Sequence, residues 1–101
     1  KYHAFAEKYL PNGSCGVVSF GVMVGREAAA AFMGHLKIAA IETHVADART
    51  CCLHPGRSPH RPINDALLIA TGFQPALVRL SCGLEDKNDL IHDIAQALDQ
   101  L

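Results

Sequence analysis

The chain has 101 residues, half of them hydrophobic, and a formal net charge of −1 at pH 7. This length allows one domain with a single core and is too short for two. The near-neutral charge and the lack of basic runs argue against a nucleic-acid partner, and no apolar run approaches the ~20 residues that cross a bilayer. We therefore expect neither nucleic acid nor membrane as a partner.

The four cysteines lie mostly in apolar stretches, and we expect no signal peptide. They are Cys15, Cys51, Cys52 and Cys82. Free thiols in such surroundings behave as small buried hydrophobes, and disulfides are rare in reducing compartments. We expect buried, reduced thiols in a cytoplasmic protein.

The first ten residues predict a helix. Tyr2, Phe5 and Tyr9 recur at helical spacing, and residues 11–13, Pro-Asn-Gly, end the run. The chain starts at Lys1, inside this pattern. We interpret it as a piece of a longer protein, with a processed small protein as the alternative.

Residues 16–24 predict a strand, because apolar side chains alternate along it. Its better core face holds Val18, Phe20, Val22 and Val24. Residues 26–37 then predict a helix. Its apolar stripe holds Ala29, Phe32, Met33 and Leu36.

Short elements follow in the middle of the chain. Residues 38–45 predict a short strand that leads into a polar loop, and residues 50–53 predict another strand. Residues 54–62 contain three prolines and cannot form regular structure. Asn64 is a suitable N-cap for a helix through Thr71, with Gly72 at its end.

The last two elements are a strand over residues 77–82 and a helix that Asp86 caps. The helix carries one apolar stripe to the end of the chain. Its members are Leu90, Ile91, Ile94, Ala97, Leu98 and Leu101. The order of elements favours an α+β two-layer sandwich, in which a small, mainly antiparallel sheet has helices on one face.

Arg79 is the first candidate site residue. It lies mid-strand and shares a face with Leu77 and Ser81. A guanidinium there can hold a carboxylate in a bidentate grip. The residues alone favour a structural arginine, either solvated or paired with Glu85 or Asp47.

A polar loop holds the second group of candidates, Thr43, His44 and Asp47. A histidine–aspartate pair can transfer protons, although a loop-stabilising hydrogen bond is the simpler interpretation.

A zinc site is the third candidate. Its possible ligands are Cys51, Cys52, His54 and His60. Adjacent cysteines rarely share an ion, so we expect no metal site. None of the four lysines has the setting of a Schiff-base lysine, so we expect no complete active site.

Three ordered blocks carry a family resemblance that covers essentially the whole chain. They are residues 77–86 with the closing helix, residues 43–55, and residues 8–20. Together they resemble the Cys/Met metabolism family of pyridoxal-phosphate (PLP) enzymes. The block at 43–55 looks most like that of O-acetylhomoserine sulfhydrylases, also called O-acetylhomoserine aminocarboxypropyltransferases. After His54-Pro55 the family usually has Ala-Ser and later Thr-His, where this chain has Gly56-Arg57 and Pro59-His60.

The resemblance implies a C-terminal domain of the aspartate-aminotransferase-like fold, with residues 1–10 as the end of a linking helix. It implies that Arg79 binds the substrate α-carboxylate, with weaker roles for Thr43 and His44. It also implies that a large upstream domain of the same chain binds PLP, so that residues 1–101 contain no catalytic residue.

For the parent enzyme the resemblance implies synthesis of homocysteine or methionine from O-acetylhomoserine and sulfide or a thiol, in a homotetramer. The isolated chain should then be inactive. A methionine γ-lyase or cystathionine-type enzyme is the alternative within the family. A free-standing, non-catalytic binding module and a zinc- or thiol-dependent small domain are the alternatives outside it.

Overall fold

The computed structural model of the chain describes residues 2–23, 25–56 and 64–101. Helices and strands follow one another in the predicted order, and most are a few residues shorter than predicted. In chain order they are α1 (His3–Tyr9), β1 (Val17–Gly21), α2 (Arg26–His35), β2 (Ala40–Ile41), β3 (Cys51–Leu53), α3 (Asp65–Ala70), β4 (Leu77–Ser81) and α4 (Lys87–Leu98). Val24, His60 and most of the proline-rich loop lie outside the described residues.

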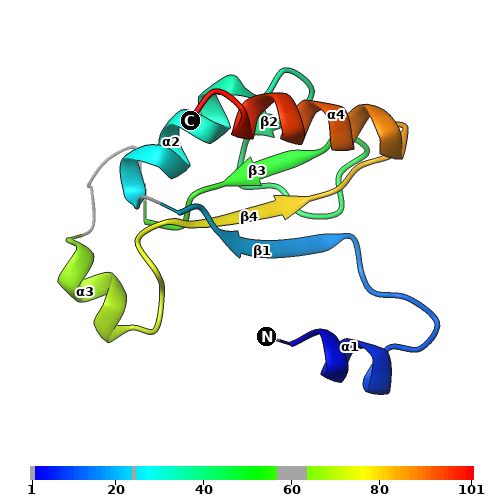
Figure 1. Cartoon of the computed structure of the whole chain (residues 1–101), viewed down its shortest axis with the longest axis horizontal. Coiled ribbons are helices and arrows are strands. Elements are labelled where there is room, and N and C mark those ends of the chain that lie inside the picture. Colours follow the sequence, from blue (N-terminus) through cyan, green and yellow to red (C-terminus); the bar gives the residue numbers. More distant parts are fainter. Residues whose placement is uncertain (1, 24, 57–63) are drawn as a thin grey trace.

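The four strands form one sheet in the order β1-β4-β3-β2. β4 pairs antiparallel with β1 and with β3, whereas the two-residue β2 runs parallel to β3. Helices α2 and α4 lie side by side over one face of this sheet (Figure 1). The predicted α+β architecture, with a mainly antiparallel sheet and helices on one face, is confirmed.

The core lies between the helix layer and the sheet. Its buried members are Val22, Ala29, Phe32, Met33, Cys52, Val78, Leu80 and Ala97. Phe20 meets Phe32 edge to face, with ring centroids 5.7 Å apart. Burying a side chain as large as Phe32 or Met33 contributes about 1.5–3 kcal/mol, so these contacts hold α2 on the sheet.

Side-chain caps begin two of the helices, as predicted. The Asn64 Oδ1 accepts a hydrogen bond from the Ala66 N–H at 2.8 Å, and the Asp86 Oδ1 accepts one from the Asn88 N–H at 2.8 Å. Each cap contributes about 1 kcal/mol. Gly72 follows α3 with a φ of 86°, which a glycine adopts without strain. These caps confirm the predicted starts of α3 and α4 and the predicted end of α3.

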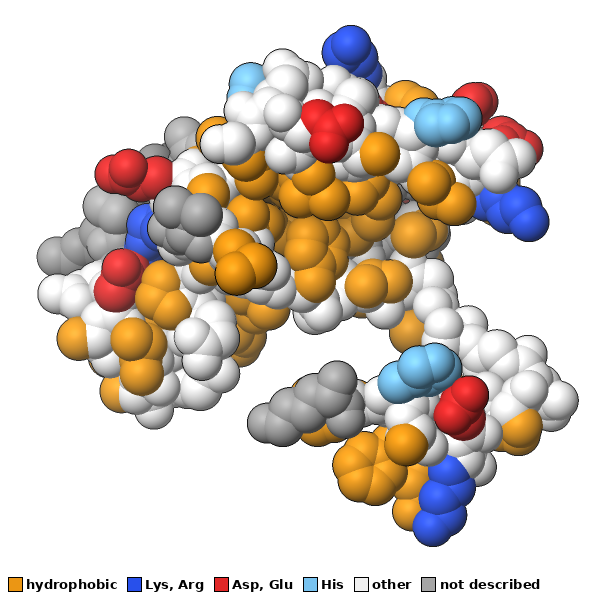
Figure 2. Space-filling view, in the orientation of Figure 1, with side chains coloured by type: hydrophobic (Ala, Val, Ile, Leu, Met, Phe, Trp, Pro, Cys, Tyr) orange, Lys and Arg blue, Asp and Glu red, His pale blue; other side chains and the backbone are white. Residues whose placement is uncertain are grey.

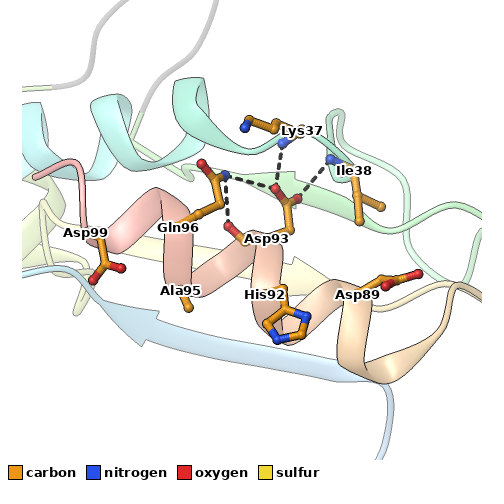
Figure 3. A pocket seen from close by; sticks show the side chains of 8 residues that line it. All are labelled: Lys37, Ile38, Asp89, His92, Asp93, Ala95, Gln96 and Asp99. Carbon is orange, nitrogen blue, oxygen red and sulfur yellow. Dashed lines mark hydrogen bonds between the residues drawn. The ribbon is translucent and has the colours of Figure 1, made fainter.

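Asp93 joins α2 to α4 through the backbone that leaves α2 (Figure 3). Its two carboxylate oxygens accept hydrogen bonds from the Lys37 and Ile38 N–H groups, each at 2.8 Å. The Gln96 Nε2 donates to the same carboxylate at 3.0 Å. Burial raises the pKa of Asp93, but the backbone and side-chain donors outweigh it, so the pKa lies below its ordinary value. The aspartate is therefore ionised at neutral pH.

An apolar groove runs between α4 and β1 (Figure 2). It measures about 610 Å³, and its lining includes Val18, Phe20, Leu90 and Ile94. Val18 is 48% exposed, although the strand pattern placed it on the core face. Val18 lines this open groove together with residues of α4, so its side chain remains half exposed instead of lying in the core.

Two further expectations of burial are wrong. In the apolar stripe predicted for the last helix, Ile91, Leu98 and Leu101 are 60%, 45% and 52% exposed. Cys15 is exposed, while Cys51 and Cys52 are buried and Cys82 is partly buried; all four thiols are free.

Helix α1 lies apart from the sheet, and none of its residues is buried (Figure 1). None of the helices in the described part of the chain has the length and apolar character needed to cross a bilayer.

Candidate functional site

Arg79 lies in the centre of the sheet. In β4 it pairs with Ser19 of β1 and with Leu53 of β3. Its neighbours in the strand, Val78 and Leu80, are buried in the core under the helices. Because side chains alternate along a strand, Arg79 points to the opposite, helix-free face, as predicted.

A hydrogen bond connects Arg79 to the loop between β2 and β3. Its Nη2 donates to the Thr43 carbonyl at 2.8 Å and lies 3.5 Å from the His44 carbonyl. Its Nε is buried and has no hydrogen-bond acceptor among the residues that the structure describes. A buried N–H left unpaired in this way costs about 1–3 kcal/mol. The structure thus brings the three predicted site residues together around a guanidinium whose buried Nε–H is unpaired among the described residues.

The two carboxylates considered as structural partners of Arg79 make other contacts. Glu85 binds Thr50 through both its oxygens, at 2.8 Å from the backbone N and 2.7 Å from Oγ1. These two donors lower the pKa of Glu85. Asp47 accepts a hydrogen bond from the Arg49 N–H at 3.2 Å. In the described part of the chain, Arg79 therefore has no carboxylate partner.

The loop that carries Thr43 and His44 is anchored to the end of β4. The Ser81 Oγ accepts a hydrogen bond from the Ala46 N–H at 3.1 Å, and the Leu84 N–H donates to the Ala48 carbonyl at 2.8 Å. Ala46 has a φ of 58°, which is uncommon for a residue with a Cβ and costs of order 1 kcal/mol. The surrounding hydrogen bonds hold the loop in this strained form.

Gly83 allows the same loop to approach the turn after β4. A Cβ at this position would lie 2.3 Å from the Ala48 carbonyl oxygen and 2.6 Å from the Arg49 carbonyl carbon. The Gly83 N–H donates to the Thr50 Oγ1 at 2.8 Å. Both features hold the end of this loop against the turn after β4.

His44 faces two carboxylates. Its Nδ1 lies 2.9 Å from the Glu42 Oε2 and 3.6 Å from the Asp47 Oδ2. The predicted His44–Asp47 pair is thus present at the longer of the two distances. Glu42 was not predicted as a partner, although it is the first polar residue that interrupts the apolar run at residues 38–41.

The described residues offer no setting for a cofactor lysine. The three lysines that the structure describes, Lys8, Lys37 and Lys87, are all exposed. A Schiff-base lysine needs a desolvated pocket or a neighbouring cation that lowers its pKa. A lysine-bound cofactor would therefore take its lysine from outside the described residues.

The zinc ligands considered from the sequence do not form one set. Cys52 lies in the core under the helices, so its strand neighbour Cys51 points to the helix-free face. The buried His54 uses its Nδ1 to accept a hydrogen bond from the Gly56 N–H at 3.1 Å. His60 lies outside the described residues. A different group comes together instead, since single ligand atoms of Glu42, His44 and Cys51 all lie within 4.8 Å of one another.

Comparison with protein families matches residues 1–99 to the Cys/Met metabolism PLP-dependent enzymes. The O-acetyl-L-homoserine sulfhydrylase 1 of Thermus thermophilus is 35% identical over 97 residues, covering 96% of this chain and 23% of that protein. The L-methionine gamma-lyase of Treponema denticola is 40% identical over 88 residues, covering 86% of this chain and 22% of that protein.

A solved structure from Campylobacter jejuni, which carries N′-pyridoxyl-lysine-5′-monophosphate, superimposes with a TM-score of 0.77 at 29% identity. The match covers 97% of this chain and 23% of that one. The chain thus spans about a quarter of the length of the proteins it matches.

Proposed function

The chain belongs to the Cys/Met metabolism family of PLP-dependent enzymes, and on this basis we propose that residues 1–101 form the C-terminal domain that binds the substrate carboxylate. Residues 1–10, which include α1, are then the end of a helix that links this domain to a large PLP-binding domain of the same chain. The match to only about a quarter of each relative supports this division.

The donor that Arg79 leaves unpaired is the observation that carries the proposal. The Nε–H is buried without an acceptor among the described residues, and the guanidinium stands on the helix-free face of the sheet. A substrate α-carboxylate would bind the guanidinium and neutralise its charge, and such charge-assisted bonds are about twice as strong as neutral ones. Thr43 and His44 contribute through the loop whose carbonyl groups hold the Nη2.

The proposed reaction makes homocysteine or methionine from O-acetylhomoserine and sulfide or a thiol. When bound, PLP serves as an electron sink that stabilises negative charge on the substrate carbon atoms. Arg79 binds the carboxylate and so fixes the orientation of the substrate toward the cofactor. The large domain supplies the cofactor lysine, so we expect the isolated 101-residue chain to be inactive.

A methionine γ-lyase is the second candidate. The Treponema denticola L-methionine gamma-lyase, at 40% identity, favours it specifically. The carboxylate contact would be the same in both enzymes, since both substrates are α-amino acids. Assays of the full-length enzyme with O-acetylhomoserine plus sulfide and, separately, with methionine alone distinguish the two reactions. A cystathionine-type enzyme would instead act on cystathionine.

The large domain is also the proposed partner of the exposed apolar surface. The groove between α4 and β1 is apolar, and the two large apolar side chains of α1, Phe5 and Tyr9, are exposed. Contact with the large domain or with neighbouring subunits of a homotetramer would cover such surface. We propose a cytoplasmic location for this assembly.

The test of the carboxylate role is Arg79→Lys in the full-length enzyme. Lysine keeps the charge but loses the planar fork of donors. Hydrogen bonds to charged groups are worth about 1.5–3 kcal/mol, so kcat/KM for the amino-acid substrate should fall by roughly 10- to 150-fold. The matched control is Arg49→Lys, at an exposed arginine of the neighbouring loop, which should change kcat/KM less than about twofold. Equal effects of the two substitutions would contradict the proposal.

The inactivity of the isolated chain needs a separate test. The purified 101-residue chain is mixed with PLP, dialysed, and examined for cofactor absorbance and for homocysteine formation. We expect neither to remain. Retained absorbance together with product formation would show that the chain holds a complete site.

A further inference from the structure

A second group of side chains lies near Arg79, and one of its members, His44, belongs to the loop whose carbonyl groups accept from the Arg79 Nη2. Its members are Glu42, His44, Asp47 and Cys51. Single ligand atoms of Glu42, His44 and Cys51 all lie within 4.8 Å of one another, and the Asp47 Oδ2 lies 3.6 Å from the same His44 nitrogen. We call these four residues the Cys51 cluster.

Strand pairing explains why Glu42 and Cys51 meet. In the parallel pairing of β2 with β3, Ala40 stands opposite Cys51, so the two side chains share a face. Glu42 lies two residues beyond Ala40 and returns to this face. Its N–H donates to the Cys52 carbonyl at 3.1 Å, which extends the pairing and holds Glu42 against β3.

The loop supplies the other two members. His44 is held near Glu42 because Arg79 binds the carbonyl groups of Thr43 and His44. The Ala46 N–H bond to Ser81 holds the turn that brings Asp47 back toward His44. Two exposed carboxylates, one imidazole and one thiol therefore converge on the helix-free face from three separate points of the backbone.

The donor types indicate which ion would fit. Thiolate and imidazole ligands favour zinc and similar transition metals, whereas magnesium and calcium prefer oxygen ligands alone. A tetrahedral zinc ion, with bonds of about 2.0–2.3 Å, separates its ligand atoms by about 3.3–3.8 Å. Small rotations of the exposed Glu42, His44 and Asp47 side chains would bring the present spacing into this range.

Cys51 is the anchor of the cluster. Its residue is only 2% exposed, and its Sγ lies 3.3 Å from the Arg49 carbonyl oxygen. Because β3 is paired on both sides, the backbone of Cys51 is fixed and its side chain stays on this face of the sheet. The other three side chains can move toward it at little cost because they are exposed.

We propose that the Cys51 cluster is a binding site for a divalent transition-metal ion of the zinc type, with the Cys51 thiolate, His44 Nδ1 and Glu42 carboxylate as ligands and Asp47 as the fourth. The ion replaces the proton of the thiol, which leaves to solvent, and any proton on the His44 Nδ1. The three anionic ligands more than balance the charge of the ion. Neither PLP nor the Arg79 guanidinium is a ligand of the ion, so the proposal can be tested independently of the proposed enzyme function.

Cobalt and zinc titrations of the reduced, metal-free 101-residue chain test this site. Cobalt bound by a thiolate gives a charge-transfer band in the near ultraviolet, which cobalt on oxygen or nitrogen ligands does not. We expect one cobalt ion per chain with this band, and displacement of cobalt by added zinc. The Cys15→Ser control, at the exposed cysteine outside the cluster, should behave like the parent chain.

The variants decide the outcome. Cys51→Ser should lose the band. Glu42→Gln and His44→Gln should weaken zinc binding at least about tenfold, which is the scale seen for residues that support a metal site. Glu42 and His44 are exposed, so these two substitutions leave the fold intact even if Cys51→Ser does not, and circular dichroism of each variant checks this. Any one of four results would overturn the proposal. The band could survive in Cys51→Ser, or it could be lost in Cys15→Ser. The zinc affinity of Glu42→Gln could equal that of the parent chain, or the chain could show no saturable metal binding.

Discussion

Replacement of Asp93 by alanine should destabilise the chain by about 2–4 kcal/mol. Asp93 is only 5% exposed, and its carboxylate accepts two backbone N–H bonds from the segment that leaves α2 (Figure 3). Alanine removes both acceptors and leaves the Lys37 and Ile38 N–H groups without them. The connection between α2 and α4 is then reduced to their packing and to the Gln96 bond with the His35 carbonyl at 2.7 Å.

The magnitude follows from these contacts. A hydrogen bond to a charged acceptor contributes about 1.5–3 kcal/mol, so two of them set a range of about 3–6 kcal/mol. The open hollow beside Asp93, lined by Ile38, His92 and Gln96 among others, admits water to the freed N–H groups (Figure 3). Rehydration recovers part of the loss, which places the expected value at about 2–4 kcal/mol. Asp93→Asn keeps one acceptor oxygen and should lose about half as much.

Urea unfolding of the 101-residue chain, followed by circular dichroism, measures this loss. Asp99→Ala is the matched control, because Asp99 is an exposed aspartate at the end of the same helix. Surface substitutions of this kind usually change the free energy of unfolding by less than about 0.5 kcal/mol. If Asp93→Ala destabilises the chain no more than Asp99→Ala does, the reasoning about the buried carboxylate is refuted.

Acid gives a second readout of the same interaction. The pKa of Asp93 is lower in the folded chain than its ordinary value of 3.8, so its contribution to stability is fully present above that ordinary value. The contribution is lost as the pH falls through the folded-state pKa. The stability difference between the parent chain and Asp93→Asn should therefore be constant near neutral pH and shrink in strong acid.

Three further predictions concern single positions. Gly83→Ala places a Cβ 2.3 Å from a backbone oxygen of the neighbouring loop and should lower the free energy of unfolding by about 1–3 kcal/mol. In the control Gly16→Ala, the nearest atom lies 3.6 Å from the new Cβ, and the same urea experiment should show a loss of less than about 1 kcal/mol. Ala46→Gly relieves a positive φ and should raise the free energy of unfolding by up to about 1 kcal/mol, partly offset by the entropy of the unfolded glycine; a clear loss would contradict this. Burial raises the pKa of the Cys52 thiol to about 11. Iodoacetamide at pH 8 should therefore modify the exposed Cys15 at least about tenfold faster than Cys52, as measured by mass spectrometry of the modified peptides. Faster modification of Cys52 than of Cys15 would contradict this prediction.

The sequence predicts most of the local structure because the relevant signals are local. Asn64 and Asp86 mark helix starts through their own side-chain bonds to nearby N–H groups. The alternation along residues 77–82 places Val78 in the core and Arg79 on the other face. Both kinds of signal depend on residues within a few positions of each other.

The remaining features depend on partners far away in the chain. Nothing near Asp93 indicates burial, because its N–H donors lie more than 50 residues earlier. The parallel pairing of β2 with β3 involves only two residues of β2, too few for a periodic pattern. The loop contacts of Arg79 likewise arise only when the turn at Ala46 folds back over β4. A local sequence pattern does not indicate such distant pairings.

The most direct test of the central claim compares two substrates in two forms of the full-length enzyme. One substrate is the natural amino acid and the other is its carboxamide, which has no charged carboxylate. With Arg79 present, kcat/KM should be at least about 100-fold higher for the carboxylate, in line with about 3 kcal/mol for a charged, bidentate contact. In Arg79→Ala, this preference should fall to within a few-fold of unity. If the Arg79→Ala enzyme keeps the full preference for the carboxylate, Arg79 does not bind it, and the account of this domain as the carboxylate-binding part of the enzyme is wrong.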